Sequence, residues 1–314
     1  MTPEQERPAP LSVRLGPVRL PNPVLTASGT FGYGAESPGL TATRRLGGIV
    51  TKTVTLEPRA GNPPPRLAET PAGLLNSIGL QNVGVEAFCR EKLPRLRELG
   101  MALIVSVGGR RPEEYAEVAR RLSGEPGIMA LEVNISCPNV KEGGLEFCQS
   151  EKAAAEVIAG IRRTTGLPLW IKLSPNVTRI GDLARVVEDN GGDGITAVNT
   201  FVGLSVDVRT RRSRLWRGSG GLSGPAIRPL ALAKVHEVVR HTRLPVIGAG
   251  GIATAQDALE FLIVGARAVQ IGTALFRDPA AGALVVEGLQ RYLEEQKLES
   301  IEQLIGTYIE GGAH

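Results

Sequence analysis

Cysteine is scarce in this sequence, which has three cysteines among its 314 residues. Cys89, Cys137 and Cys148 are odd in number, and their spacings match neither a disulfide framework nor a zinc site. Structural disulfides are characteristic of secreted proteins, so this usage favours the reducing cytoplasm as the location of the chain.

Long hydrophobic runs are also absent. No apolar run approaches the roughly 20 residues that a membrane-spanning helix needs, and the N-terminal MTPEQERPAP lacks the apolar core of a signal peptide. We therefore expect no membrane anchor. The net charge of +4 is small for a chain of this length, and it favours anionic small molecules over nucleic acid as ligands.

Hydrophobic residues make up 42% of the chain, which is enough to bury a large core. Eight short apolar runs stand out, and most of them are continuous and β-branched, as expected for strands buried on both faces. Helical patterns separate many of the runs, for example 85–99, 113–122 and 226–241, and a helical tail covers 275–309. This alternation predicts an α/β protein, a (β/α)8 TIM barrel that forms one domain over residues 1–314. The predicted strands are 23–27, 48–51, 102–105, 129–133, 169–173, 195–198, 245–248 and 268–271.

Two other segments complete the predicted organisation. LSVRLGPVRL reads as a short β-hairpin around Gly16 and Pro17, which we expect to plug the base of the barrel. Three connections, 53–84, 138–150 and 200–224, are unusually long, and long loops in a compact domain are typically lids or binding segments. All three follow predicted strands, so they should overhang the same mouth.

Polar residues follow several of the predicted strands, at the face where TIM barrels carry their active sites. The residues that end or follow the strands are Ser28, Lys52, Ser106, Asn134, Lys172, Asn199, Gly250 and Gly272. Two lysines and two asparagines exceed what turns alone require, so the sequence predicts a site at this mouth.

The last two strands are followed by Gly250-Gly251 and Gly272-Thr273, and each pair leads into a predicted helix. Backbone amides at helix starts bind phosphate, and barrels often use the loops after strands seven and eight for this purpose. For either pair alone, tight turns explain the glycines equally well. The two pairs together favour a ligand that carries a phosphate.

Cys137 lies in VNISCPN, among polar residues at the end of the fourth predicted strand, so its thiol should face the mouth. A thiol there could act as a nucleophile or as a general base. A Cys-His protease arrangement has no suitable partner, because the histidines lie on a late helix or at the C-terminus. Cys89 fits a packed helical stripe, and the role of Cys148 stays open.

Lys52 and Lys172 could each be a Schiff-base nucleophile, a cation that holds a carboxylate or phosphate, or a solvated charge, and their position favours the first two. The segment VDVRTRRSRLWRG, residues 206–218, contains five arginines and one tryptophan. A solvated hairpin is the favoured interpretation of this segment, ahead of a partner or nucleic-acid surface.

Seven motifs occur in order from Thr51 to Ile252: TKTVTLEPRAGNPPPR, NSIGLQN, VNISCPN, IKLSPN, VNTF, GGLSGPAIRPLAL and VIGAGGI. Together they resemble the FMN-containing subunit of the class 1B dihydroorotate dehydrogenases, over essentially the whole chain. Cysteine in VNISCPN, where the membrane-bound class 2 enzymes have serine, agrees with the expected lack of an anchor. GLQN in place of the GLPN typical of class 1A favours class 1B.

The resemblance implies oxidation of (S)-dihydroorotate to orotate in pyrimidine biosynthesis, with Cys137 as the base that takes the proton from C5 and FMN as the hydride acceptor. A free thiol has a pKa of about 8.5, so activity should rise toward mildly alkaline pH. The implied FMN-binding residues are Ser28, Lys52, Thr53, Ser106, Asn134, Lys172, Val198, Gly224, Gly250, Gly251, Gly272 and Thr273. The implied substrate-binding residues are Lys52, Asn76, Ser77, Ile78, Gly79, Leu80, Asn134, Asn199 and Thr200.

The sequence departs from the family pattern in two places. Ser106 stands where the family has asparagine, which predicts a weaker hydrogen bond to the flavin, and LEFCQS replaces a more usual glycine-containing loop. The resemblance also implies an electron-transfer subunit with FAD and a 2Fe-2S cluster, assembled with this chain as a heterotetramer that passes electrons to NAD. The sequence contains no cluster motif and suggests no metal site of its own.

Three alternatives stay open from the sequence. A related FMN barrel could act on another pyrimidine, such as uridine in RNA, with the arginine-rich segment as support, although the chain has no RNA-binding extension. A Schiff-base aldolase could use Lys172 on a phosphorylated substrate. A non-catalytic barrel is disfavoured by the combination of Lys52, Cys137 and Lys172.

Overall fold

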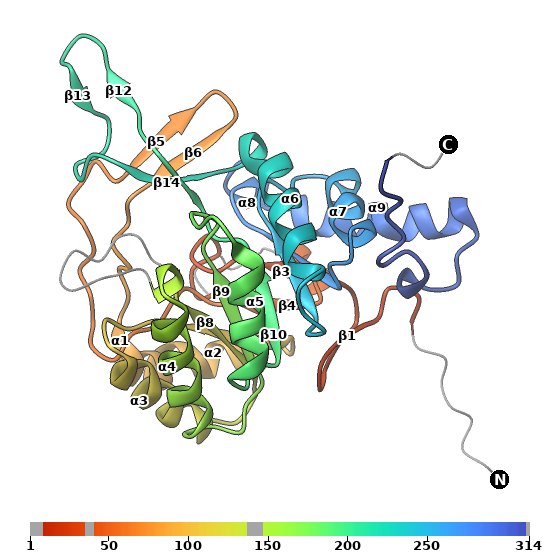
Figure 1. The fold of residues 1–314 in the computed structure, drawn as a ribbon, viewed down its shortest axis with the longest axis horizontal. Helices are drawn as coiled ribbons and strands as arrows, with labels where there is room; N and C mark the ends of the chain where they lie inside the picture. The colour runs from red at the N-terminus through yellow and green to blue at the C-terminus, as the bar shows by residue number, and fades with distance from the viewer. Residues whose placement is uncertain (1–8, 35–40, 137–146, 312–314) are drawn as a thin grey trace.

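The fold is a closed barrel of eight parallel strands, seen in a computed structural model that describes residues 9–34, 41–136 and 147–311 (Figure 1). Around the barrel the strands follow the order β10-β15-β16-β3-β4-β7-β8-β9. Each expected strand is present, with bounds that differ by two residues or fewer. They are β3 (Val24–Thr26), β4 (Gly48–Val50), β7 (Ala102–Val107), β8 (Ile128–Asn134), β9 (Leu169–Leu173), β10 (Gly194–Ala197), β15 (Val246–Ala249) and β16 (Ala268–Ile271).

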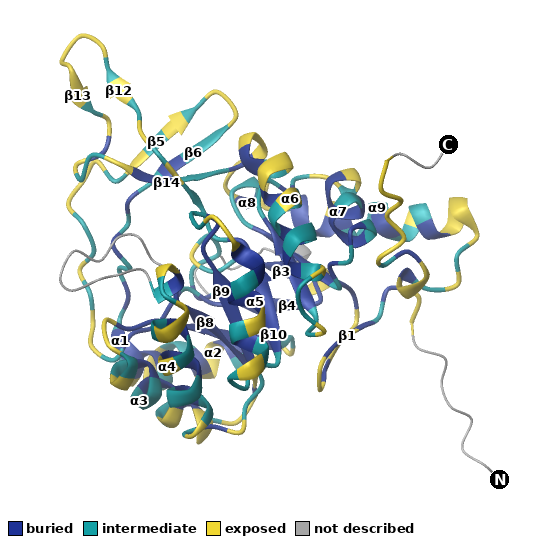
Figure 2. Cartoon of the chain, in the orientation of Figure 1, coloured by how far each residue is buried: buried dark blue, intermediate teal, exposed yellow. Residues whose placement is uncertain are grey.

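The strands form because each is a short run that can be buried on both faces. Every residue of β9 and β10 is buried, and Figure 2 shows the barrel strands as the most completely covered part of the molecule. Neighbouring strands pair in parallel, for example Ile195 of β10 with Ile171 of β9 and with Val246 of β15. The carboxyl ends of all eight strands therefore open at one mouth.

Helices cover the outside of the barrel. The predicted helix 85–99 forms as α1 (Gly84–Ala87), a π-helical turn (Phe88–Lys92) and α2 (Leu93–Arg97), with Pro94 in the first turn of α2, where its missing N–H is tolerated. The others are α3 (Pro112–Ser123), α4 (Glu151–Arg162), α5 (Ile180–Asp189), α6 (Arg228–Val239), α7 (Ala255–Ile263), α8 (Ala274–Arg277) and α9 (Ala281–Gln296).

The first strand-to-strand connection departs from the expected alternation. Between β3 and β4 the described residues contain a 3-10 helix, Thr41–Arg45, and no α-helix. The C-terminal α9 packs against both this 3-10 helix and β3. The last helix of the chain therefore covers the first strand.

The expected N-terminal hairpin is present as β1 (Val13–Leu15) and β2 (Val18–Leu20), joined by Gly16 in a left-handed conformation. Val13, Leu15, Val18 and Leu20 are buried in the main core. The turn approaches the carbonyl of Asp193, directly before β10, so the hairpin lies at the amino end of the barrel as predicted.

Two of the long connections, 53–84 and 200–224, were predicted as loops, but parts of them pair to form a sheet. β5 (Leu67–Thr70) and β6 (Gly73–Asn76) join β11 (Phe201–Gly203) and β14 (Gly220–Ser223) in a four-stranded antiparallel sheet. This sheet lies beyond the carboxyl ends of the barrel strands (Figure 1). The third long connection, 138–150, lies mostly outside the described residues.

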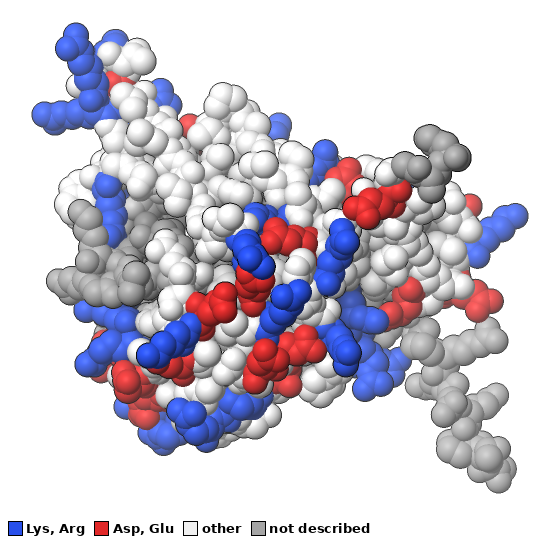
Figure 3. Space-filling view, viewed as in Figure 1, with Lys and Arg blue, Asp and Glu red and all other residues white. Residues whose placement is uncertain are grey.

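The arginine-rich segment is a projecting hairpin, as favoured from the sequence. β12 (Val206–Asp207) pairs with β13 (Arg212–Ser213), and the turn from Arg209 to Arg212 is exposed. Figure 3 shows Lys and Arg gathered at its tip, with both charge signs mixed over the helices below. Among the described helices, none is long and apolar enough to cross a membrane.

Candidate active site

A cavity of about 1080 Å³ opens at the carboxyl ends of the barrel strands, beneath the four-stranded sheet. It brings together most of the residues predicted from the sequence. Of the predicted set, the lining contains Ser28, Lys52, Thr53, Asn76, Ile78, Gly79, Leu80, Asn134, Lys172, Val198, Asn199, Thr200, Gly224, Gly250, Gly251, Gly272 and Thr273. Ser77 and Ser106 lie behind the wall, and Cys137 lies outside the described residues.

Ser106 lies one layer away from the cavity. It is fully buried on β7, where its backbone N–H donates to Thr51 Oγ1 at 3.2 Å. Its hydroxyl lies 2.9 Å from Thr53 Oγ1, and Thr53 lines the cavity. The short serine side chain therefore contacts the cavity wall through Thr53.

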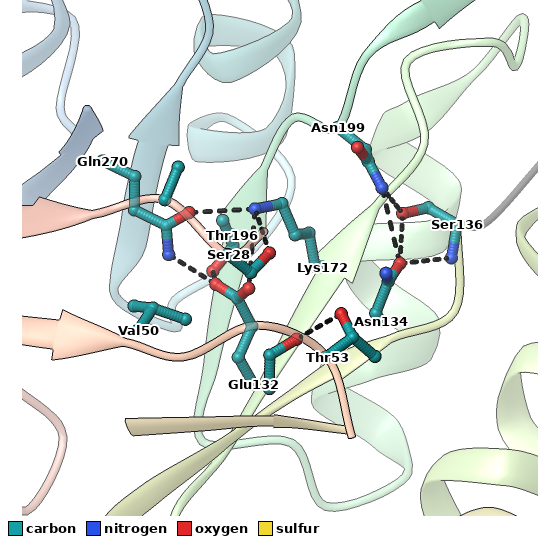
Figure 4. Close-up of polar contacts among 12 residues, drawn as sticks. Ser28, Val50, Thr53, Glu132, Asn134, Ser136, Lys172, Thr196, Asn199 and Gln270 are labelled. Atoms are coloured by element: carbon teal, nitrogen blue, oxygen red, sulfur yellow. Dashed lines mark hydrogen bonds and ion pairs between the residues drawn. The ribbon is translucent and has the colours of Figure 1, made fainter. Parts of the chain in front are cut away.

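The floor of the cavity is a charged network that joins four barrel strands (Figure 4). Lys172 of β9 forms an ion pair with Glu132 of β8, with Nζ 3.5 Å from Oε1. Lys172 Nζ also donates to Gln270 Oε1 of β16 at 2.9 Å and to Ser28 Oγ at 3.2 Å. Thr196 of β10 donates to Glu132 Oε2 at 3.0 Å.

Sequence reasoning named Lys172 and Ser28 but missed Glu132 and Gln270. Glu132 is fully buried in the middle of β8, and Gln270 lines the cavity from β16. The missed signal is a charged residue inside the apolar run MALEV, because a carboxylate is rarely buried there without a partner. The ion pair with Lys172 supplies that partner.

A second polar cluster stands beside the floor and fixes two asparagine side chains (Figure 4). Asn199 Nδ2 donates to Ser136 Oγ at 2.7 Å, and Ser136 Oγ donates to Asn134 Oδ1 at 3.0 Å. Thr200 N–H donates to Asn199 Oδ1 at 2.8 Å. These contacts fix the orientation of the Asn134 and Asn199 side chains in the cavity wall.

The segment 76–80 forms another wall. Asn62 holds it from behind, because its amide Nδ2 donates to the Ser77 carbonyl at 2.8 Å and to Ser77 Oγ at 3.0 Å. Ser77 therefore anchors the segment and does not face the cavity. Gly79 and Leu80 have positive φ angles of 75° and 54°, which turn the chain sharply along the cavity wall.

The last two strands end in a cradle with the features of a phosphate site. Gly251 has a φ angle of 78°, and a Cβ there would lie 2.8 Å from the backbone nitrogen of Arg228. α7 begins just beyond it, and Thr254 and Asp257 cap the N-terminus of that helix with a capping box. The glycines at the ends of β15 and β16 leave the backbone open to an anion at the cavity wall, so the residues present fit a phosphate-bearing cofactor.

We expect Gly251→Ala to weaken binding of a phosphate-bearing cofactor about tenfold or more, equivalent to about 1.4 kcal/mol. The added Cβ occupies an unfavourable left-handed conformation and collides with Arg228, so the cradle must shift. Flavin fluorescence titration of purified protein measures the dissociation constant. Gly166→Ala is the control, because a Cβ there meets nothing within 4 Å, and unchanged affinity in Gly251→Ala would contradict the assignment.

The two described cysteines are packing residues. Cys89 is half-buried against the core, and burial, with a smaller contribution from Glu125, raises the pKa of its thiol. Cys148 is buried, and its sulfur accepts a hydrogen bond from Ser174 N–H at 3.4 Å. Within the described ranges, no group of three or more His, Cys, Asp or Glu side chains could hold a metal ion.

The chain is similar to known proteins over nearly its full length. The family model for dihydroorotate dehydrogenase matches residues 10–293. A protein of Geotalea uraniireducens named dihydroorotate dehydrogenase B (NAD(+)), catalytic subunit, is 50% identical over 95% of this chain and 98% of its own length. A protein of Desulforamulus reducens with the same name is 49% identical over 95% and 98%.

A solved structure supports the fold independently. The crystal structure of DHODH in complex with ferulenol from Eimeria tenella superposes with a TM-score of 0.80 at 24% identity, covering 97% of this chain and 90% of that one. The family model and the curated relatives support dihydroorotate dehydrogenase and give the Schiff-base aldolase no support. The chain belongs to the dihydroorotate dehydrogenase family.

Proposed function

We propose that this chain oxidises (S)-dihydroorotate to orotate as the catalytic subunit of a class 1B, NAD-linked dihydroorotate dehydrogenase. The observation that carries the proposal is the identity of 47 to 50% with proteins named as that catalytic subunit, over about 95% of the chain. The lining of the cavity supports it, because cations, amide groups and a glycine cradle suit a phosphate-bearing flavin and a polar ring.

FMN is the proposed cofactor. Its phosphate would be held by Gly250, Gly251, Gly272 and Thr273, and its ring system by Ser28, Thr53, Lys172, Val198 and Gly224, with Ser106 acting through Thr53. When bound, FMN accepts the hydride that leaves C6 of dihydroorotate. Lys172 would place a positive charge near the part of the ring that becomes anionic on reduction.

The substrate is proposed to lie between the segment 76–80 and the asparagine cluster. Asn134 and Asn199 would hydrogen-bond the ring amides, Asn76 and Thr200 would complete the polar contacts, and Lys52 would hold an anionic group. Cys137 would take the proton from C5, which leaves the electron pair to form the new ring double bond as hydride departs from C6. Packing of the segment 76–80 against the substrate ring would exclude water from the reacting atoms.

Electrons are proposed to leave through a partner subunit that carries FAD and a 2Fe-2S cluster, in a heterotetramer of two such pairs that reduces NAD. The support is the word "subunit" in the names of the relatives. We also propose that residues 1–314 act as one domain and that the enzyme works in the cytoplasm.

Reconstitution tests this function directly. The purified chain is loaded with FMN, supplied with dihydroorotate and a dye acceptor, and assayed for orotate. We expect orotate formation by the chain alone, and NAD reduction only when the electron-transfer subunit is added. Tight FMN binding without orotate formation would overturn the substrate, and a chain that does not bind FMN would overturn the cofactor.

A further inference from the structure

A carboxylate lies directly beneath the cavity and is covered by a lysine. Glu132 has no exposed surface, and the side chain of Lys172 above it is 5% exposed. Lys172 lines the cavity, whereas Glu132 is not among the lining residues. The positive group therefore faces the cavity and its counter-charge lies behind it.

The surrounding hydrogen bonds fix this order of charges. Gln270 donates through Nε2 to Glu132 Oε2 and accepts through Oε1 from Lys172 Nζ at 2.9 Å, so its amide spans both members of the pair. Thr196 Oγ1 donates to the same Glu132 oxygen at 3.0 Å. Because both donors contact Oε2, Oε1 is directed to the ammonium, 3.5 Å away.

We propose that Glu132 is a positioning residue whose carboxylate balances the charge of Lys172 and thereby limits how strongly the cavity floor stabilises an anionic, reduced flavin. This inference rests on the proposed function, because it takes FMN as the occupant of the cavity. A lone ammonium in the cavity floor would favour a reduced, anionic flavin strongly, since charges interact more strongly in a site of low dielectric constant. A carboxylate directly behind the ammonium opposes that effect.

Glu132→Gln tests the proposal, because it keeps the side-chain volume and removes the negative charge. We expect the equilibrium between oxidised and reduced FMN to shift about tenfold toward the reduced form, a rise of about 30 mV in the two-electron midpoint potential. The potential is measured by equilibration with a reference dye, and flavin fluorescence gives the affinity for oxidised FMN. Since the oxidised ring is neutral, that affinity should stay within about threefold.

The matched control is Thr196→Val, which removes one hydrogen bond to Glu132 and keeps its charge. Its midpoint potential should match that of the wild-type protein. Glu132→Asp is the second variant in case Glu132→Gln does not fold. It draws the carboxylate back by one methylene, so we expect a smaller rise in the same direction.

The outcomes separate this inference from the proposed function. A wild-type protein that does not bind FMN would overturn the proposed function. A wild-type protein that binds FMN, with Glu132 variants whose potential stays the same or falls, would overturn this inference alone. Equal weakening of oxidised and reduced FMN binding would show that Glu132 has only a structural role.

Discussion

Cys137→Ala should slow reduction of bound FMN by dihydroorotate about 100-fold to 10,000-fold, the range typical for loss of a general base. The variant cannot take the proton from C5, so the hydride cannot leave C6 at the normal rate. Affinity for FMN should be unchanged, because the proposed cofactor contacts do not include this residue. Stopped-flow absorbance in the absence of oxygen measures the rate, and titration of FMN measures the affinity.

Cys89→Ala is the matched control for the same chemistry. Cys89 packs half-buried on the outer helical layer, and its thiol has a raised pKa. Reduction by dihydroorotate should proceed at the wild-type rate in this variant. If Cys89→Ala and Cys137→Ala lost activity equally, or if Cys137→Ala kept it, the role of Cys137 as the base would be wrong.

Lys172→Met should lower the free energy of unfolding of the FMN-free protein by about 3–5 kcal/mol. The substitution leaves Glu132 buried with no cation beside it, and an uncompensated buried charge is costly. Urea unfolding followed by circular dichroism measures the change. The same variant should also bind reduced FMN less tightly, because the cavity floor loses its positive charge.

The double variant Lys172→Met with Glu132→Gln distinguishes the effect of the charge pair on stability from the effect of side-chain packing. It replaces both charges with neutral side chains of similar length, so most of the lost stability should return. A double variant as unstable as Lys172→Met would mean that packing of the lysine stem, and not its charge, explains the loss. A stable Lys172→Met variant would contradict the buried ion pair.

The barrel could be predicted from the sequence because its strands are local, continuous apolar runs. The bounds of β9 agree with the prediction at both ends, and β16 does as well. The sheet over the mouth could not be predicted, because it pairs segments far apart in the chain. Gly221 pairs with Asn76, 145 residues earlier, and glycine-rich β14 has no strand pattern of its own.

The residues of the candidate site could be predicted where their position at the end of a barrel strand determines that they face the cavity. Polar residues at the ends of barrel strands must face the mouth, and Lys172, Asn134 and Asn199 do so. Ser106 and Ser77 are buried behind the cavity wall, because the direction of a short side chain depends on neighbours such as Thr53 and Asn62. Their roles toward FMN and substrate stay predictions.

The most direct test of the central claim is to add dihydroorotate, without oxygen, to the purified chain loaded with FMN while its visible spectrum is recorded. We predict that the oxidised flavin absorption bleaches and that one orotate forms for each flavin reduced. A flavin that binds but stays oxidised in the presence of excess dihydroorotate would contradict the proposed activity.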